Sequence, residues 1–247
     1  MIKFHPSARQ LSDFVEGTLS PAISLMVSAH CDMCGKCQRR VEIETESLAA
    51  EMVSSAGAKM DDNIDMSFQF GDMLSQITTL PSGKQSDLGT VHDVEYQEPL
   101  KKHTIRRSQA GVSTIELDGR TFTLPRTLHR YIDKTGSWSS LVGKLWQAPV
   151  DLGNQGVANF IFMGSGGSVP EHTHRGTEYT LVIDGEFSDG LSRYDTGDFI
   201  FMNGEKTHTP KAEGKEGCLV FTIVDQPLHF TSGLARLLNP FSHLFFR

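Results

Sequence analysis

The chain has 247 residues, a formal net charge of −7 and 38% hydrophobic residues, a composition typical of globular and not of disordered proteins. No apolar run approaches the roughly 20 residues of a membrane span, and the opening MIKFHPSARQ lacks the apolar segment of a signal peptide, so we expect a cytoplasmic protein without membrane contact. The acidic balance argues against direct binding of nucleic acid. Four cysteines, three of them between Cys31 and Cys37, do not form a disulfide framework and indicate a metal or redox site in a reducing compartment.

The first 80 residues lack strand-like alternation and predict a small helical bundle. Ser7 is placed to cap a helix that continues to Val15. Ser20 followed by Pro21 is a second start signal, because proline fits the first helical position. Further helix-compatible segments follow at residues 47–57 and 62–80.

Beyond the helical part, residues 81–103 are polar and turn-rich and predict a linker. After them, short apolar runs are separated by glycine, aspartate and asparagine, namely VSTIEL, NFIFM, YTLVI, DFIFM and CLVFTIV. This texture is typical of a β-sandwich or barrel. We therefore predict a multidomain α and β chain, with a helical domain at 1–80, an all-β domain at 104–230 and a packed, helical tail at 231–247.

The first candidate metal cluster lies in the helical part. His30, Cys34 and Cys37 are spaced i, i+4 and i+7, so on one continuous helix they would share a face. One imidazole and two thiolates can hold Zn²⁺ tetrahedrally and leave one position for a ligand from elsewhere. His5 is the candidate for that position, because a short N-terminal arm could fold back to deliver it.

Two other interpretations of these cysteines stay open. Three cysteines could simply pack in the core of an amphipathic helix. Cys31 and Cys34 also form a C-x-x-C pair, although the βαβ context of a dithiol oxidoreductase is missing. Cys31 is not needed for the zinc set.

The sequence His30-x3-Cys34-x2-Cys37 after an upstream His5 resembles the signature of the zinc-binding anti-sigma domain. In that family a small helical bundle clamps the two halves of an extracytoplasmic-function sigma factor and blocks its docking on core RNA polymerase. The resemblance covers about residues 1–80. It implies that these four residues hold a structural zinc ion and that the partner is a sigma factor, while Cys31 departs from the minimal pattern.

The second candidate cluster lies in GGSVPEHTHRGTEYTLVIDGEF, which matches the first cupin motif at each anchor residue. His172 and His174 would point to the same side of a strand, because alternate residues share a face. Glu178 would enter from the next strand, and His208 from the opposite side of the barrel. Three histidines and a carboxylate suit Zn²⁺, Fe²⁺, Mn²⁺ or Ni²⁺, among which the sequence does not choose.

The second cupin motif is matched only in part. Gly197 and His208 have the expected spacing, but Asn203 stands where proline is usual and Glu205 where glycine is usual. Ala212 replaces the terminal asparagine. We interpret this stretch as a drifted turn that keeps its metal ligand.

The remaining histidines and the fourth cysteine lack spaced partners, and we expect none of them to bind metal. These residues are His92, His103, His129, His229, His243 and Cys218. Cys218 lies in an apolar strand and is expected to be buried.

A zinc-binding anti-sigma domain followed by a cupin resembles the ChrR family over nearly the entire chain. The resemblance implies a regulator, and not an enzyme, that inhibits transcription by holding a sigma factor and receives oxidative signals at the cupin. A change at the cupin metal or at the thiols would shift the domain arrangement and release the partner.

The alternative is a metal-dependent cupin oxygenase or isomerase that acts on a small molecule in the barrel. No catalytic residue can be assigned for it, since Glu171, the one suggestive carboxylate, is expected to face solvent. This alternative also leaves the helical zinc domain unexplained.

Overall fold

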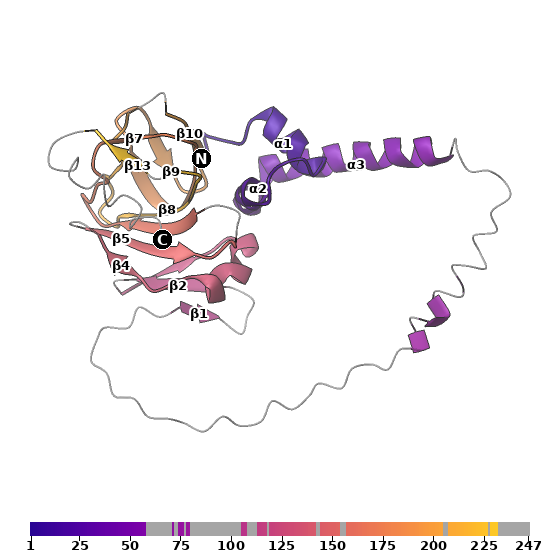
Figure 1. Cartoon of the computed structure of the whole chain (residues 1–247), viewed down its shortest axis with the longest axis horizontal. Helices are drawn as coiled ribbons and strands as arrows, with labels where there is room; N and C mark the ends of the chain where they lie inside the picture. Colours follow the sequence, from indigo (N-terminus) through magenta and orange to yellow (C-terminus); the bar gives the residue numbers. More distant parts are fainter. Residues whose placement is uncertain are drawn as a thin grey trace, which may run out of the picture. The chain divides into compact units, whose positions relative to one another are not determined.

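Helices occupy the N-terminal part of the chain and antiparallel strands the remainder, as predicted (Figure 1). The computed structural model describes residues 1–57, 71, 74–76, 78–79, 105–107, 113–117, 119–141, 144–153, 157–204, 207–226 and 228–231. None of the helices in these ranges has the length and apolar character that a membrane crossing demands.

The chain divides into two compact units, residues 1–46 with 103–247 and residues 47–102. The described part of the second unit is helical, comprising the end of helix α3 and residues 71, 74–76 and 78–79. The predicted boundary at residue 80, the linker at 81–103 and most of the tail at 231–247 lie outside the described residues, so these boundaries stay predictions.

The first two helices begin where the sequence places their caps. Helix α1 (Ala8–Val15) starts after Ser7, whose hydroxyl accepts from the Gln10 backbone N–H at 3.2 Å while the Gln10 side chain accepts from the Ser7 N–H at 2.8 Å. This reciprocal capping box satisfies two amide groups that the helix itself leaves without acceptors. Helix α2 (Pro21–Met33) starts after Ser20, with proline at its first position.

The prediction that His30, Cys34 and Cys37 share one helix is wrong. Helix α2 ends at Met33, and Cys34 has extended backbone angles, φ −117° and ψ 95°. Helix α3 (Gly35–Gly57) begins directly afterwards, about twelve residues before the predicted start at residue 47. The i, i+4 and i+7 spacing of the ligands did not reveal this break, because two consecutive helices can have the same sequence pattern as one long helix.

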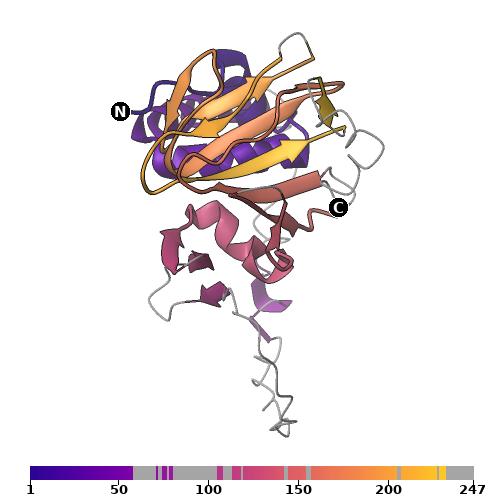
Figure 2. The same cartoon turned by 90° about the vertical axis from the view of Figure 1, so that its left-hand side faces the viewer.

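The strands build the double-layered barrel of a cupin. The larger sheet has the order β10-β8-β12-β6-β5-β4, and its strands appear in orange and pink in Figure 2. Strand β12 lies between β8 and β6, and all seven of its residues are buried, which explains its unbroken apolar sequence. The bounds are β4 Ser139–Ser140, β5 Leu145–Val150, β6 Val157–Met163, β8 Glu178–Ser188, β10 Phe199–Met202 and β12 Cys218–Val224.

Shorter strands complete the barrel around the long strand β8. Strands β9 and β11 pair with the C-terminal half of β8, and β7 pairs with β13. A separate sheet has the order β1-β2-β3. The bounds are β1 Ile105–Arg107, β2 Ser113–Leu117, β3 Arg120–Thr123, β7 His172–His174, β9 Arg193–Asp195, β11 Lys211–Ala212 and β13 Leu228–Phe230.

The elements between residues 120 and 150, among them a 3₁₀ helix and strand β5, were not predicted. A 3₁₀ helix, η1 (Arg126–Lys134), packs against α2, where the Asp32 carboxylate accepts from the Thr127 backbone N–H at 2.6 Å and from its hydroxyl at 2.7 Å. Strand β5 contains Pro149, which argues against a strand because proline cannot donate to a neighbouring strand.

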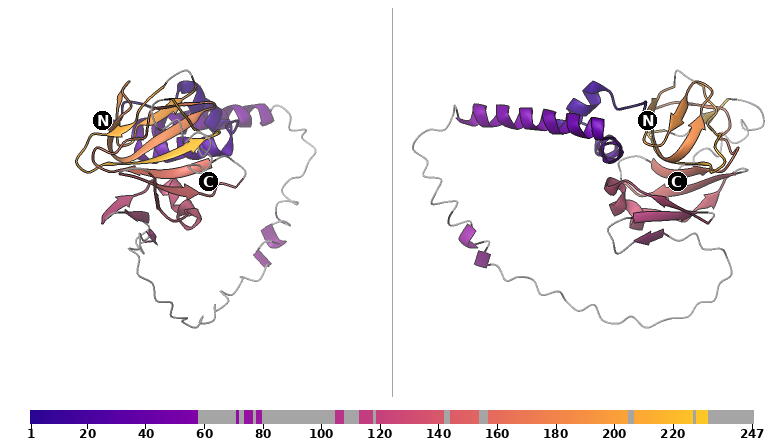
Figure 3. Two further views of the ribbon diagram at one scale, coloured as in Figure 1. Left: turned by 60° about the vertical axis from the view of Figure 1, so that its left-hand side comes forward. Right: turned by 180° about the vertical axis from the view of Figure 1, so that it is seen from behind.

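The N-terminal segment and the barrel belong to the same compact unit. Figures 2 and 3 show this segment, in indigo, beside the orange strands. Their buried side chains form one continuous core, in which Leu25 and Met26 of α2 belong to the same cluster as Phe160 and Phe221 of the barrel.

Candidate metal centres

The first centre brings together the four predicted ligands His5, His30, Cys34 and Cys37, whose ligand atoms all lie within 4.8 Å of one another. They come from the arm before α1, from α2, from the break after α2 and from α3. His5 is half-buried and the other three are buried. The convergence that the sequence predicted is present, although it is reached across two helices instead of along one.

The spacing of these atoms fits a tetrahedral ion. His5 Nδ1 lies 3.4 Å from His30 Nε2, 3.5 Å from Cys34 Sγ and 3.4 Å from Cys37 Sγ. Around a Zn²⁺ ion with Zn–N of about 2.0–2.1 Å and Zn–S of about 2.3 Å, tetrahedral angles separate two nitrogens by about 3.3 Å and a nitrogen from a sulfur by about 3.5 Å. The donor set and its spacing therefore suit zinc.

The His30 ring is prepared for this role by a contact to the barrel. Its Nδ1 donates to the Gly197 carbonyl oxygen at 2.9 Å, and because a carbonyl only accepts, the proton must sit on Nδ1. Nε2 then presents its lone pair to the centre. Burial lowers the pKa of His30 to about 4, although the bond to Gly197 opposes this, so the ring is neutral at physiological pH.

Cys31 lies outside the first centre, as predicted. It is half-buried, and its thiol is not part of the four-atom cluster. Burial raises its pKa to about 11, which disfavours the reactive thiolate form. In the described part of the chain, all four cysteines are free of disulfide bonds.

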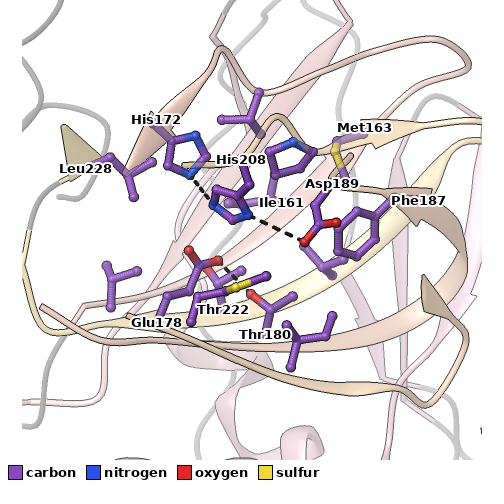
Figure 4. A pocket seen from close by; sticks show the side chains of 16 residues that line it. Ile161, Met163, His172, Glu178, Thr180, Phe187, Asp189, His208, Thr222 and Leu228 are labelled. Atoms are coloured by element: carbon purple, nitrogen blue, oxygen red, sulfur yellow. Dashed lines mark hydrogen bonds and ion pairs between the residues drawn. The ribbon is translucent and has the colours of Figure 1, made fainter. Parts of the chain in front are cut away.

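The second centre gathers His172, His174, Glu178 and His208 inside the barrel. Strand β7 supplies both of the first two histidines, and Glu178 is the first residue of β8. His208 reaches the site because its backbone forms an antiparallel bridge with His172. Figure 4 shows His172 and His208 facing each other, with Glu178 across the cavity from them.

The second centre has shorter spacings than the first. His208 Nε2 lies 2.9 Å from both His172 Nε2 and His174 Nε2, and His174 Nε2 lies 2.9 Å from Glu178 Oε2. A single N–H on His208 cannot serve two ring nitrogens at once, whereas an ion among them would take all the lone pairs. Ligands at right angles around an ion at about 2.1 Å are about 3.0 Å apart, so the set fits an ion with more than four positions.

Hydrogen bonds orient two ligands of the second centre. His172 Nδ1 donates to the Pro170 carbonyl oxygen at 2.8 Å, which leaves Nε2 free to bind metal. The Thr180 hydroxyl donates to Glu178 Oε1 at 2.7 Å. Burial alone would raise the pKa of Glu178, but the hydrogen bond and charge of His174 lower it to about 2, so the carboxylate is ionised. Burial, followed by the charge of His208, lowers the pKa of His172 to about 4.

The second centre opens into a cavity with mainly apolar walls. About 580 Å³ in and around its mouth is free of protein atoms, part of it open to solvent, but the centre of a water-sized sphere can move through only about 50 Å³. The hydroxyl of Thr222 is buried at this cavity and has no hydrogen-bond partner among the described residues. The space therefore fits a molecule of a few heavy atoms.

Sequence reasoning missed Asp189, which lies beside the second centre. Its carboxylate is 2% exposed, accepts from the Tyr194 hydroxyl at 2.9 Å and lies 3.9 Å from His208 Nδ1. It also accepts from the backbone N–H groups of Leu191 and Ser192 at 2.8 and 2.7 Å. The turn-like sequence SDGLS predicts the backbone contacts, but nothing in it points to the metal ligand.

The residues expected to have no metal role are placed accordingly where the structure describes them. His129 Nε2 donates to the Leu124 carbonyl oxygen, and Cys218 is fully buried in β12. Glu171 is half-buried and accepts from the Thr231 hydroxyl at 2.8 Å. His229 lies in β13 outside both clusters, while His92, His103 and His243 lie outside the described residues.

The first centre predicts a sharp difference between two cysteine variants. Cys37→Ser removes one ligand and is expected to lose about one equivalent of bound zinc together with the thiolate-to-cobalt absorption of the Co²⁺-loaded protein. Cys31→Ser is the control and should keep both, because its thiol lies outside the cluster. Equal loss in the two variants would contradict the assignment.

Zinc binding at the first centre is expected to strengthen as pH rises. Burial, with Cys34 adding to it, raises the pKa of Cys37 to about 12, so the thiol keeps its proton until the metal displaces it. For each proton released, the apparent zinc affinity rises about tenfold per pH unit. His30 is already neutral above its pKa of about 4, so it contributes no proton release between pH 6 and 8. Competition with a chelator at pH 6, 7 and 8 measures this slope, and a flat profile would contradict thiolate ligation.

Comparisons with known proteins agree with the fold. The family model described as the ChrR cupin-like domain matches residues 130–227. The anti-sigma-E factor ChrR of Cereibacter sphaeroides is 30% identical over 242 residues, which cover 97% of this chain and 98% of the relative.

One solved structure in particular has the same fold. The crystal structure of Rhodobacter sphaeroides SigE in complex with the anti-sigma ChrR aligns with a TM-score of 0.59 at 24% identity, over 91% of this chain and 100% of that chain. An RmlC-like cupin from Ralstonia eutropha aligns with a TM-score of 0.36 at 17% identity, over 40% of this chain and 69% of its own. Because the 30% identity extends over almost the full length of both sequences, the chain belongs to the ChrR family of anti-sigma factors.

Proposed function

We propose that this protein is an anti-sigma factor that binds and inhibits an extracytoplasmic-function sigma factor in the cytoplasm, with an oxidative stress signal entering through a metal in its cupin domain. The observation that carries the proposal is the full-length relation to an anti-sigma-E factor together with the converged ligands His5, His30, Cys34 and Cys37. A cupin enzyme has no need of the first centre, which lies in the helical part.

Helix α3 offers a surface for a protein partner. Ile43, Met52 and Val53 are 65%, 64% and 73% exposed, although side chains of this kind are usually buried. These three residues lie on one helix but do not share one face, because nine positions, or about two and a half turns, separate Ile43 from Met52. Exposed apolar side chains are nevertheless typical of surfaces that bind another protein. This surface supports helix α3 as part of the sigma-binding site.

Zinc at the first centre would link the arm, α2 and α3 into one unit. Zn²⁺ supplies a fixed tetrahedral link and no redox chemistry of its own. The protein prepares the site by holding His30 with Nε2 toward the ion and by burying Cys34 and Cys37. The thiolates balance the charge of the ion and are the groups that an oxidant would attack.

The second centre suits a sensor better than a structural site. Its metal, whose identity the ligands leave open, would keep positions for a small molecule beside the Thr222 hydroxyl. The apolar walls exclude bulk water, and Glu178 holds a negative charge against the ion.

Binding of the sigma factor is expected to depend on the apolar side chains of α3. The double variant Ile43→Glu with Val53→Glu should weaken the affinity of the purified protein for its sigma factor by about 30-fold or more, because buried anchors of this kind carry most of an interface's binding energy. Thr45→Glu with Ser54→Glu adds the same charge at exposed polar positions of α3 and is the matched control. Absence of any complex between the wild-type chain and the sigma factor would reject the proposed function.

A second candidate function is a metal-dependent oxygenase or isomerase, which the enclosed cavity at His172, Glu178 and His208 favours. We expect the Fe²⁺-loaded protein to consume O₂ with a β-diketone or a thiol no faster than free Fe²⁺ does, because Asp189, the carboxylate that lines the cavity besides Glu178, is held by the Tyr194 hydroxyl and two backbone N–H groups. An oxygen electrode measures this rate. Turnover of about 1 s⁻¹ or more, lost in Glu178→Ala, would establish the enzyme instead.

A further inference from the structure

The N-terminal arm, residues 1–6, lies along one short segment of the barrel. Strand β9 turns into β10 through residues 194–199, which we call the docking segment. The Phe199 backbone N–H donates to the Phe4 carbonyl oxygen at 3.0 Å, so the arm extends the hydrogen bonding of β10. These contacts join residues almost 200 positions apart in the sequence.

The carboxylate of Asp198 is built to receive this arm. Its Oδ1 accepts from the backbone N–H groups of Lys3 at 2.6 Å and Phe4 at 3.0 Å, and its Oδ2 accepts from the Asp195 N–H at 2.8 Å. Asp198 is 0% exposed. A buried carboxylate is strongly destabilising without donors, so removal of the arm would leave Oδ1 without both of its partners.

Side chains of the arm add to these backbone contacts. The Phe4 ring lies 4.8 Å from the Tyr194 ring, and Lys3 Nζ lies 2.7 Å from Asp195 Oδ2. Ile2 covers Gly197 so closely that a Cβ at Gly197 would lie 2.5 Å from Ile2 Cδ1. Gly197 also has φ +91°, which a side chain would strain.

Both histidines of the first centre are fixed by the same docking segment. His5 directly follows Phe4, whose backbone is bonded on both sides to the barrel. His30 donates to the Gly197 carbonyl oxygen at 2.9 Å, and its ring lies 5.8 Å from that of Phe199. In the part of the chain that the structure describes, the Cys34 and Cys37 thiols contact His5 and form no such hydrogen bond to the barrel.

We propose that the docking segment of the cupin domain is a binding site for the chain's own N-terminal arm and thereby positions His5 and His30, so that both domains together build the first metal centre. The cupin domain would then set the zinc affinity of the helical domain. This deepens the proposed function, because it names the place where a change in the barrel reaches the helices that face the sigma factor.

The docking segment also reaches toward the second centre. The Tyr194 hydroxyl donates to Asp189 Oδ2 at 2.9 Å, and the same oxygen lies 3.9 Å from His208 Nδ1 (Figure 4 shows this last contact). Phe187 packs against Tyr194 from within the barrel, with ring centroids 5.0 Å apart. Tyr194 thus contacts both Phe4 of the arm and Asp189. Asp189 in turn lies beside His208, a ligand of the second centre.

Two variants of Lys3 in the full-length protein test the docking. Lys3→Pro removes the backbone N–H that donates to Asp198, whereas Lys3→Ala keeps this N–H and removes only the ion pair with Asp195. The readout is Co²⁺ and Zn²⁺ affinity from thiolate-to-cobalt absorption, which reports only the first centre because the second has no sulfur ligand. Lys3→Pro is expected to weaken the affinity by about 10–100-fold, the usual cost of losing a contact that orients a metal ligand, and Lys3→Ala by less than about threefold.

Asp198→Ala tests the same contact from the barrel side, at a residue that is not a ligand, because it removes the oxygen that accepts from Lys3 and Phe4. It should also weaken the first centre, while an unchanged metal content at the second centre shows that the barrel is still folded. Wild-type affinity in both Lys3→Pro and Asp198→Ala would overturn the proposal. A loss in Lys3→Pro alone would also overturn it, because the arm would then act without the docking segment. None of these measurements involves a sigma factor, so they can fail while the proposed function stands, or succeed while it falls.

Discussion

The arrangement of the helices depends on four ligand atoms that must meet although they come from four separate segments. In its described residues, the helical part has few buried apolar side chains besides the ligands Cys34 and Cys37, namely Leu11, Ala22, Leu25, Met26, Val27 and Ala29. A core of this size does not by itself outweigh the conformational entropy of the chain. Two other features compensate: the binding free energy of an ion, which adds to folding, and a core that continues into the barrel.

The barrel meets a different demand, because it must hold polar ligands inside an apolar interior. Strand β7 has only three residues, and alternation places both of its histidines on the inner face and Thr173 between them on the outer one. The backbone bridge to His172 brings His208 in from the neighbouring segment, and not from the opposite side of the barrel as predicted. His172 donates its Nδ1 proton to the Pro170 carbonyl oxygen, which ties this ligand to the backbone.

Much of this could be predicted from the sequence, for identifiable reasons. The ligands of both centres were predicted because metal sites need particular donors at short spacings, and the caps at Ser7 and Ser20 because they are local. The break at Cys34 was missed because two short helices and one long one share the same periodicity. Gly197 was noted as an anchor of the second cupin motif, but the role of its carbonyl and the role of Asp189 were missed, because both depend on tertiary contacts and a backbone carbonyl has no sequence signal.

The break at Cys34 divides the first centre into two halves with different attachments. His5 and His30 are tied to the barrel, while Cys34 and Cys37 belong to the joint where α2 passes into α3. An ion bound by these four residues would therefore connect two parts of the protein. One part is continuous with the cupin barrel, and the other is helix α3 with its exposed apolar residues. Severing the two metal–sulfur bonds would free α3 at this joint and leave the histidines where the barrel holds them. If α2 and α3 were one unbroken helix, the loss of the metal–sulfur bonds would not free α3.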